Sequence, residues 1–380
     1  MQISARSTIP ASERALRQLD QAAGDEPLRL PTNIRHVIGG AEAMLAQVIV
    51  TWAQRNANPK LETFISSAAQ IDDFVRRLPG LVAALCASDA IGTPTAHSIF
   101  RDLRSAALTR LNQLQGNQPK QSYRGPSAEI LCADHLGRSA PYLLYVPDQR
   151  GGSRLRPREN FRDLARWLLQ GVIPREYRAL IDLEATEAIG AMLFEIFKNT
   201  EDHALVDATG DLLGISVRAI KTNHHAIKPD ELGRIVEEFG PLATYCESLR
   251  PPQGAAQTHL FELSVLDSGP GFAVTWTGRP LDQLSHEEEE NAVRACFGRG
   301  SAKSRSHFGE GLPHVLRLLR RQAGFLRLRT GRLSFYLDFS ARDKVDGAAG
   351  LRRHEADDAL GLAPASGSLL TILIPMRRSS

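Results

Sequence analysis

The chain has 380 residues, of which 42% are hydrophobic and 23% are charged, and its formal net charge is +3. This composition is typical of a globular protein of about two domains, and so small a charge gives no argument for nucleic-acid binding. Cys86, Cys132, Cys246 and Cys296 are far apart and show no CxxC or Cys/His spacing, which argues against a zinc site or a disulfide framework.

The first 26 residues are polar and predict a loosely held leader with one short helix. They lack the apolar core of a signal peptide. No apolar run approaches the ~18–20 residues that span a bilayer. Even the run at 43–55 is broken by Gln47. We therefore expect a cytoplasmic protein without a membrane partner.

From residue 34 to residue 90, helix-like and strand-like runs alternate, which favours a small α/β unit. A helix is predicted at 96–115, followed by a pair of strands at 128–137 and 140–146. The basic, Gly- and Pro-containing stretch 147–160 is the best candidate for a domain boundary. Residues 1–150 are thus expected to form an N-terminal α/β domain that binds a protein partner or acts as a sensor.

The second part, 151–380, has a clearer pattern of elements. The predicted helices are 159–172, 182–203, 230–249 and 312–323, and the predicted strands are 212–220, 259–269, 325–330, 333–340 and 368–375. The first two of these strands can pair antiparallel. The polar segment 278–311 has too little periodicity to be packed throughout.

The helix at 182–203 carries a polar stripe on an otherwise apolar surface. Glu195, Asn199 and Asp202 are spaced by four and three residues, so they point in the same direction. The opposite side is apolar, with Ile189, Leu193 and Phe197. Burying an acid and an amide costs several kcal/mol unless a partner satisfies them. The stripe therefore needs a partner, which the downstream sequence suggests.

Three glycine-bearing segments follow the stripe along the chain. They are Asp267-Gly269-Gly271 in "LDSGPGF", Gly309-Gly311-Leu312 in "GEGLPHV" and Gly367-Ser368 in "GSLLTILIP". Each is weak alone, but their order after an ExxxN helix resembles the nucleotide-binding domain of the GHKL ATPases. That superfamily includes DNA gyrase, the ninety-kilodalton heat-shock chaperone, histidine kinases and MutL. The resemblance covers residues 160–376.

The resemblance implies an α+β fold of the Bergerat type, in which a mixed, largely antiparallel sheet is covered on one face by helices. It also implies Mg²⁺ and ATP as ligands. By this similarity Asn199 supplies its amide oxygen to Mg²⁺, and Glu195 activates the attacking water as a general base. Asp202 would hold a water or Asn199 in place. His203 would face phosphate, although a histidine that merely ends the helix is equally compatible.

The adenine end of the expected site lies at the strand ends. Asp267 resembles the family's adenine reader, whose carboxylate accepts from the exocyclic amine. Gly269 and Gly271 would let the backbone pass close to the base. Ser368 stands where the family usually has Thr, and its hydroxyl would share a water with Asp267.

The phosphate end involves the second glycine segment. Gly309, Gly311 and Leu312 would lie against the phosphates, with the amides of the following helix aimed at the anion. Residues 278–311 would form the lid over ATP, and Lys303 in "SAK" would reach the γ-phosphate. Arg299, Arg305 and His307 are further candidates for phosphate contacts, or a solvated loop face.

Simpler interpretations remain for several of these residues. Glu195 and Asn199 could be a buried polar pair that only fixes packing, and Asp267 a turn residue at a strand end. His224 and His225 are interpreted as a loop tip, because adjacent side chains diverge. Six arginines are interpreted as the wet face of amphipathic elements, so nucleic-acid binding is not favoured; they are Arg317, Arg320, Arg321, Arg327, Arg329 and Arg332.

Three functions stay open at this point. The favoured one is an ATPase whose lid closure drives a conformational or dimerisation switch on a partner, with ATP-dependent homodimers as one form of it. A histidine kinase would need a phosphoacceptor on a helix hairpin, and His36 and His97 lack that context. In the third, ATP only organises a binding surface and is not hydrolysed. Single-turnover hydrolysis separates the first from the third, and phosphoramidate formation identifies the second.

Overall fold

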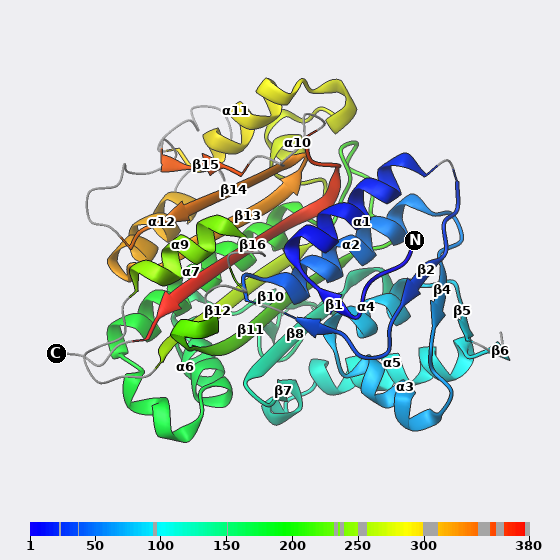
Figure 1. Ribbon diagram of the computed structural model, residues 1–380, viewed down its shortest axis with the longest axis horizontal. Coiled ribbons are helices and arrows are strands. Elements are labelled where there is room, and N and C mark those ends of the chain that lie inside the picture. The colour runs from blue at the N-terminus through cyan, green and yellow to red at the C-terminus, as the bar shows by residue number, and fades with distance from the viewer. Residues whose placement is uncertain are drawn as a thin grey trace.

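The computed structural model describes the chain except residues 23, 37, 94–96, 150, 232–234, 236–238, 250–256, 299–310, 341–349, 355–360 and 377–380. The fold is α+β, as predicted. Within the described ranges eight strands form one antiparallel sheet, here the large sheet, in the order β15-β14-β13-β16-β12-β11-β8-β7 (Figure 1). Their bounds are β7 Tyr123–Arg124, β8 Ser127–Ala133, β11 Val217–Ile227, β12 Thr258–Asp267, β13 Phe325–Gly331, β14 Leu333–Asp338, β15 Arg352–Arg353 and β16 Ala365–Pro375.

One face of the large sheet is covered by helices from the second part of the chain. They are α6 Arg158–Val172, α7 Leu183–His203, α10 Phe272–Thr277, α11 His286–Cys296 and α12 Gly311–Arg321. The spacing of apolar residues explains this arrangement: in α12, Leu312, Leu316 and Leu319 recur every three or four residues and are buried. The predicted helices at 159–172, 182–203 and 312–323 therefore correspond to α6, α7 and α12.

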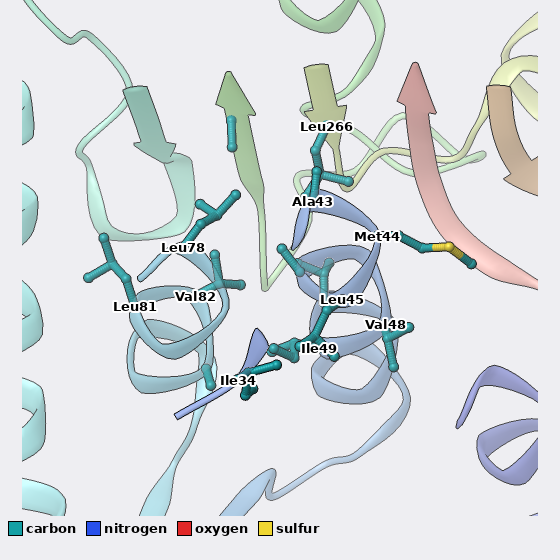
Figure 2. Packing of buried hydrophobic residues seen from close by; sticks show 14 of the residues in the cluster. Ile34, Ala43, Met44, Leu45, Val48, Ile49, Leu78, Leu81, Val82 and Leu266 are labelled. Atoms are coloured by element: carbon teal, nitrogen blue, oxygen red, sulfur yellow. The ribbon is translucent and has the colours of Figure 1, made fainter. Parts of the chain in front are cut away.

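The other face is covered as well, which corrects the expectation of helices on one face only. The covering helices are α1 Ile9–Gln21, α2 Ala41–Arg55, α4 Leu78–Cys86, α5 Phe100–Gln115 and α9 Gly240–Ser248. The reason is that successive residues of the central strands are apolar on both sides. On β12, Leu260 packs with this second layer of helices, whereas Phe261 packs with the first. Figure 2 shows α2 and α4 side by side beneath the strands.

A smaller sheet lies at one side of the molecule and belongs to the predicted α/β unit. Among the described residues it has the order β2-β4-β5-β6, with the first three strands parallel. Its elements are β2 Leu28–Leu30, β4 Lys60–Thr63, β5 Asp89–Gly92 and β6 His97–Ser98, with α3 Ala68–Val75 between β4 and α4. Two short ladders lie outside these sheets: β1 Arg6–Ser7 pairs with β3 Arg35–His36, and β9 Tyr145–Pro147 pairs with β10 Ser153–Leu155.

The predicted pairing of 128–137 with 140–146 is wrong. Strand β8 pairs with β7 and β11, whereas β9 pairs with β10. Because β8 precedes residue 150 and β11 follows it, the large sheet is assembled from both predicted parts of the chain. The antiparallel pairing expected for 212–220 and 259–269 is present as β11 with β12.

The N-terminal residues are packed rather than loosely held. Leu16 of α1 is fully buried, and the Glu13 carboxylate bonds the Arg329 guanidinium at 2.9 and 3.0 Å. The prediction of a wet face for Arg327 and Arg329 is wrong, because both are buried on β13. They face the second layer of helices, where Glu13 provides the counter-charge that the local sequence does not reveal.

His224 and His225 lie within β11, so the interpretation as a loop tip is wrong. The His224 Nε2 atom is 3.2 Å from Nδ1 of His259, and burial lowers the pKa of His224 to about 4. His225 approaches the Glu262 carboxylate at 3.3 Å on the other face of the sheet. Adjacent strand residues face opposite sides, which explains their separate partners.

Two other predicted segments are described in part. Of 230–249, the structure describes α9 and a short 3₁₀ turn at Pro229–Glu231. The predicted lid, 278–311, contains α11, which Ser285 and Glu288 cap reciprocally. Glu289 anchors this helix to Arg332 at 2.7 Å. None of the helices in the described ranges is both long and apolar enough to span a bilayer.

Candidate functional site

A cavity of about 280 Å³ lies between the C-terminal half of α7 and the ends of β12 and β16. Nine of the predicted site residues line it: Glu195, Asn199, Asp202, His203, Asp267, Gly271, Gly311, Leu312 and Ser368. Gly269 lies beside Asp267 but outside the lining. Lys303 and Gly309 lie outside the described residues. Four segments that are remote in sequence therefore meet at one cavity.

The polar stripe of α7 faces this cavity, whereas Leu193 and Phe197 face the core of the first layer. Helix α7 begins at the Asp182 cap, whose carboxylate accepts from the Glu184 N–H at 2.7 Å. The packing of these apolar residues in the core fixes the rotation of α7 about its own axis. The stripe is consequently directed into open space rather than into packed side chains.

Glu195, on α7, lies next to Gly311 at the start of α12. A Cβ at Gly311 would lie 2.8 Å from the Glu195 Oε2 atom, so a larger residue there would require the Glu195 carboxylate to shift. The Oε1 atom is 3.4 Å from Nη1 of Arg158, at the start of α6. Arg158 also contacts His314 Nε2 at 2.5 Å. The sequence did not indicate Arg158, because nothing near it marks a link to Glu195.

Around Asn199 the helix offers oxygen atoms and one cation. Lys198 Nζ is 2.5 Å from the Asp202 carboxylate, and both residues line the cavity. Lys198 is another residue that no motif singled out, although it adjoins Asn199. Within the described part of the chain the Asn199 amide makes no hydrogen bond, so it is available to a ligand. Amide and carboxylate oxygens are the donors that a hard cation such as Mg²⁺ prefers.

Asp267 closes the opposite end of the cavity. Its Oδ1 accepts from the Gly269 N–H at 2.9 Å. Burial raises the pKa of Asp267 to about 6, although the backbone amides of Gly269 and Ser368 and the charge of Arg218 act in the opposite direction. The carboxyl is therefore held in a largely desolvated place, where a donor from a ligand would stabilise its ionised form.

Ser368 stands opposite Asp267 in the ladder between β12 and β16. Its hydroxyl is 3.1 Å from that of Thr330, which also bonds the Gly367 carbonyl. Gly367 has φ +65°, and a Cβ there would lie 1.9 Å from the Asp267 carbonyl oxygen. This glycine allows the two strand ends to touch, which places the Asp267 and Ser368 side chains together.

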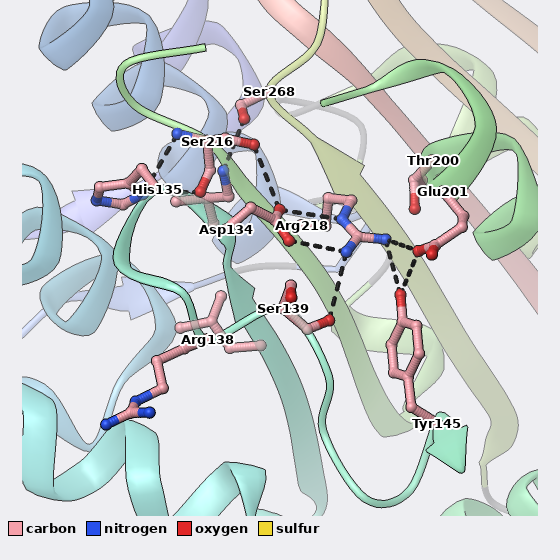
Figure 3. A network of polar contacts seen from close by, with 12 residues as sticks. Asp134, His135, Arg138, Ser139, Tyr145, Thr200, Glu201, Ser216, Arg218 and Ser268 are labelled. Carbon is pink, nitrogen blue, oxygen red and sulfur yellow. Dashed lines mark hydrogen bonds and ion pairs between the residues drawn. The ribbon is translucent and has the colours of Figure 1, made fainter. Parts of the chain in front are cut away.

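A buried ionic network fixes the C-terminal half of α7 to β11 (Figure 3). Arg218 is fully buried and bonds both Asp134 oxygens, at 3.0 and 2.8 Å, and Glu201 at 2.5 Å. Tyr145 completes the network, with its hydroxyl 3.0 Å from Arg218. Glu201 lies between the cavity residues Thr200 and Asp202, so this network sets the position of the polar stripe.

Among the described residues no group of three or more His, Cys, Asp or Glu side chains is arranged to hold a metal by itself. Comparisons of the chain with models of protein families, with curated proteins and with solved structures find no match.

Proposed function

We propose that the protein binds Mg·ATP in this cavity and hydrolyses it in the manner of the GHKL ATPases. One observation carries the proposal: the four segments that the sequence motifs single out line the same cavity. The layer formed by the large sheet with α6, α7 and α12 would then be a Bergerat-type sandwich. The order of the motifs along the chain and their meeting at one cavity are separate observations, because a short motif does not by itself bring remote segments together.

In this proposal adenine occupies the end of the cavity at Asp267. An ionised carboxylate accepts from the exocyclic amine, and the Ser368 hydroxyl supports it through a water. Gly271 has φ +83°, and a Cβ there would lie 2.8 Å from the Thr330 hydroxyl. A side chain at this position would displace the strand ends that hold the base.

The phosphates would lie along α7 toward the start of α12. Asn199 would hold Mg²⁺ through its amide oxygen, with Asp202 nearby, and Lys198 would add a positive charge. The cation neutralises phosphate charge and orients the phosphates when bound. Glu195 would accept the proton of the attacking water, and its closeness to Gly311 places it beside the helix start that would bind phosphate.

The test compares nucleotide binding with phosphate release in single-residue variants. Glu195→Ala is expected to bind Mg·ATP but to hydrolyse it about 10²–10⁴-fold more slowly, the range usual for a lost general base. Asn199→Ala is expected to lose the Mg²⁺-dependent part of binding. Glu187→Ala is the matched control, because Glu187 lies on α7 but is exposed and pairs with Arg162. Hydrolysis by Glu195→Ala at the parent rate would contradict the assignment.

One contact favours a second candidate function, a nucleotide-gated module that does not hydrolyse ATP. The Arg158 guanidinium lies 3.4 Å from the Glu195 carboxylate, and this ion pair occupies an oxygen that would otherwise be free to accept from an attacking water. If single-turnover experiments show tight ATP binding without phosphate release in both the parent and Arg158→Ala, this second function replaces the first.

A further inference from the structure

Helix α2 carries a polar stripe that the proposed function does not use. Gln47, Thr51 and Gln54 are spaced by four and three residues, so they lie on one side of an otherwise apolar helix. Gln47 and Thr51 are fully buried, and Gln54 is half-buried. A buried polar side chain needs a partner. Each of the three bonds backbone atoms in or next to the strands of the large sheet, although the Gln47 Oε1 atom has no partner among the described residues.

Gln54 holds the segment that carries Asp267. Its Nε2 donates to the Ser268 carbonyl at 2.9 Å and to the Ile215 carbonyl at 2.8 Å. Ser268 lies between Asp267 and Gly269, past the last ladder pair of β12. Its own hydroxyl accepts from the Val217 N–H at 2.7 Å. The position of Ser268 thus depends on α2 and on the start of β11.

Thr51 and Gln47 hold the segment that carries Ser368. The Thr51 hydroxyl accepts from the Ser366 N–H at 2.9 Å, and Gln47 Nε2 donates to the Ser366 carbonyl at 3.1 Å. Ser366 directly precedes Gly367, whose backbone lies against Asp267. One helix therefore bonds both strand ends at which the cavity residues Asp267 and Ser368 face each other.

These bonds do more than satisfy buried groups. The ladder between β12 and β16 ends at Asp267 and Ser368, so beyond that pair these two strands no longer hold each other, although β13 still pairs with β16 at Gly331 and Ala365. Rotation of the Ser268 peptide would move the Asp267 carboxyl directly, because the two residues share a peptide bond. The side chains of α2 replace the missing ladder at this point.

We propose that α2 sets the geometry of the base-reading end of the cavity, with Thr51 and Gln54 as positioning residues for adenine. The inference rests on the proposed function and deepens it. The layer of helices formed by the first part of the chain then controls nucleotide affinity through two side chains, without contacting the nucleotide. A partner that shifted α2 would change affinity for the base and leave the phosphate contacts alone.

The experiment uses the full chain with Thr51→Val and Gln54→Met, which remove the polar groups at similar volume. Each is expected to weaken ATP binding about tenfold, the usual effect of one lost buried hydrogen bond, because each loses its one bond to Ser366 or Ser268. Affinity for magnesium tripolyphosphate, which has no base, is expected to stay within about twofold, and the preference for ATP over GTP to fall. A merely structural defect would weaken both ligands together.

Two controls complete the design. Thr51→Ser keeps the hydroxyl and is expected to bind ATP like the parent. Arg55→Ala, also on α2, removes a surface ion pair with Asp20 of α1 and is expected to change neither affinity. If Thr51→Val and Gln54→Met bind ATP with the parent affinity, the inference is overturned while the proposed function stands.

A parent chain that binds no ATP would overturn the proposed function instead. Amide hydrogen exchange of the nucleotide-free chain then tests separately whether α2 holds the segment after Asp267 in place. Faster exchange at Gly269 and Gly271 in Gln54→Met, with α7 unchanged, supports it. Unchanged exchange at these two residues rejects it.

Discussion

The Asp267 carboxyl should make base recognition depend on pH. Its pKa in the folded protein is about 6, compared with the ordinary value of 3.8, because it is buried. The ionised form accepts from adenine, so affinity is expected to be full above about pH 7 and to fall as pH drops through about 6. Titrations of ATP binding on both sides of this pKa measure the effect.

Asp267→Asn is the control for that titration. It should bind ATP more weakly at neutral pH and retain only the pH dependence of the nucleotide itself.

The raised pKa of Asp267 also means that folding favours the protonated acid. This contribution to stability is present below pH 3.8 and lost as pH rises through about 6, so Asp267→Asn should raise the melting temperature at neutral pH. An affinity of the parent for ATP that does not fall as pH drops through about 6 would reject the role of this carboxyl in base recognition.

Two neighbouring arginines on β13 offer a matched comparison of buried charges. Arg329 bonds Glu13 through two nitrogens, together with the Gly331 and Ala363 carbonyls. Arg327 is equally buried, but its Nε and Nη1 atoms have no hydrogen-bond partner among the described residues. Burial lowers the pKa of Arg327 to about 10. Arg329 is thus fully bonded, whereas Arg327 has a longer ion pair with Glu13, at 3.8 Å, and a contact with the Met44 sulfur.

Arg329→Met is therefore expected to lower the free energy of unfolding by about 3–5 kcal/mol, since Glu13 would lose its bidentate partner. Arg327→Met should be neutral or stabilising by about 1–2 kcal/mol, because Glu13 keeps Arg329. Urea unfolding of both variants measures the difference. Equal losses in the two would show that Arg327 is as well satisfied as Arg329.

At the level of elements, the start of α2 requires a glycine at position 40. Gly40 has φ +79°, and a Cβ there would lie 2.2 Å from the Thr371 hydroxyl on β16. The Gly39 and Gly40 N–H groups bond the buried Glu262 carboxylate at 2.7 and 3.1 Å, so an acid from the sheet sits at the helix N-terminus. Glycine permits both the positive φ and the close approach.

Gly40→Ala is expected to cost about 2–4 kcal/mol, from the left-handed backbone and from the collision with Thr371. Gly137 has φ +66°, but nothing lies within 4 Å of the place that a methyl group would occupy there. Gly137→Ala should therefore cost only about 1 kcal/mol of backbone strain. Thermal unfolding of the two variants separates the two effects. Similar losses would mean that β16 yields to the methyl group.

Periodicity was sufficient for the elements whose apolar residues recur at regular intervals, such as α6 and α12. It failed for α11, whose run of glutamates resembles a loop, although the Ser285–Glu288 capping box was a local signal for its start. The predicted strand 212–220 also ends too early, because β11 continues to Ile227. Lys221 is buried there because Glu42 and Glu129, from distant segments, pair with it at 3.2 and 3.4 Å.

For the molecule as a whole, the motifs predicted which segments would surround the cavity, because each carries its own local pattern. Arg158, Thr330 and the stripe of α2 could not be found in that way. Their relation to the cavity exists only after the strands have paired and both layers of helices have packed on the sheet, and no spacing within one segment encodes it.

The turn between β9 and β10 has a practical consequence for the covalent chain. Gly151 and Gly152 are exposed there, and nothing lies within 4 Å of a side chain added at either. A protease site placed at this turn should be cut under native conditions. The two pieces should nevertheless elute together, because β8 stays paired with β11 and α2 stays packed on the sheet. Fragments that separate without denaturant would mean that the backbone link, rather than the shared sheet, holds the molecule together.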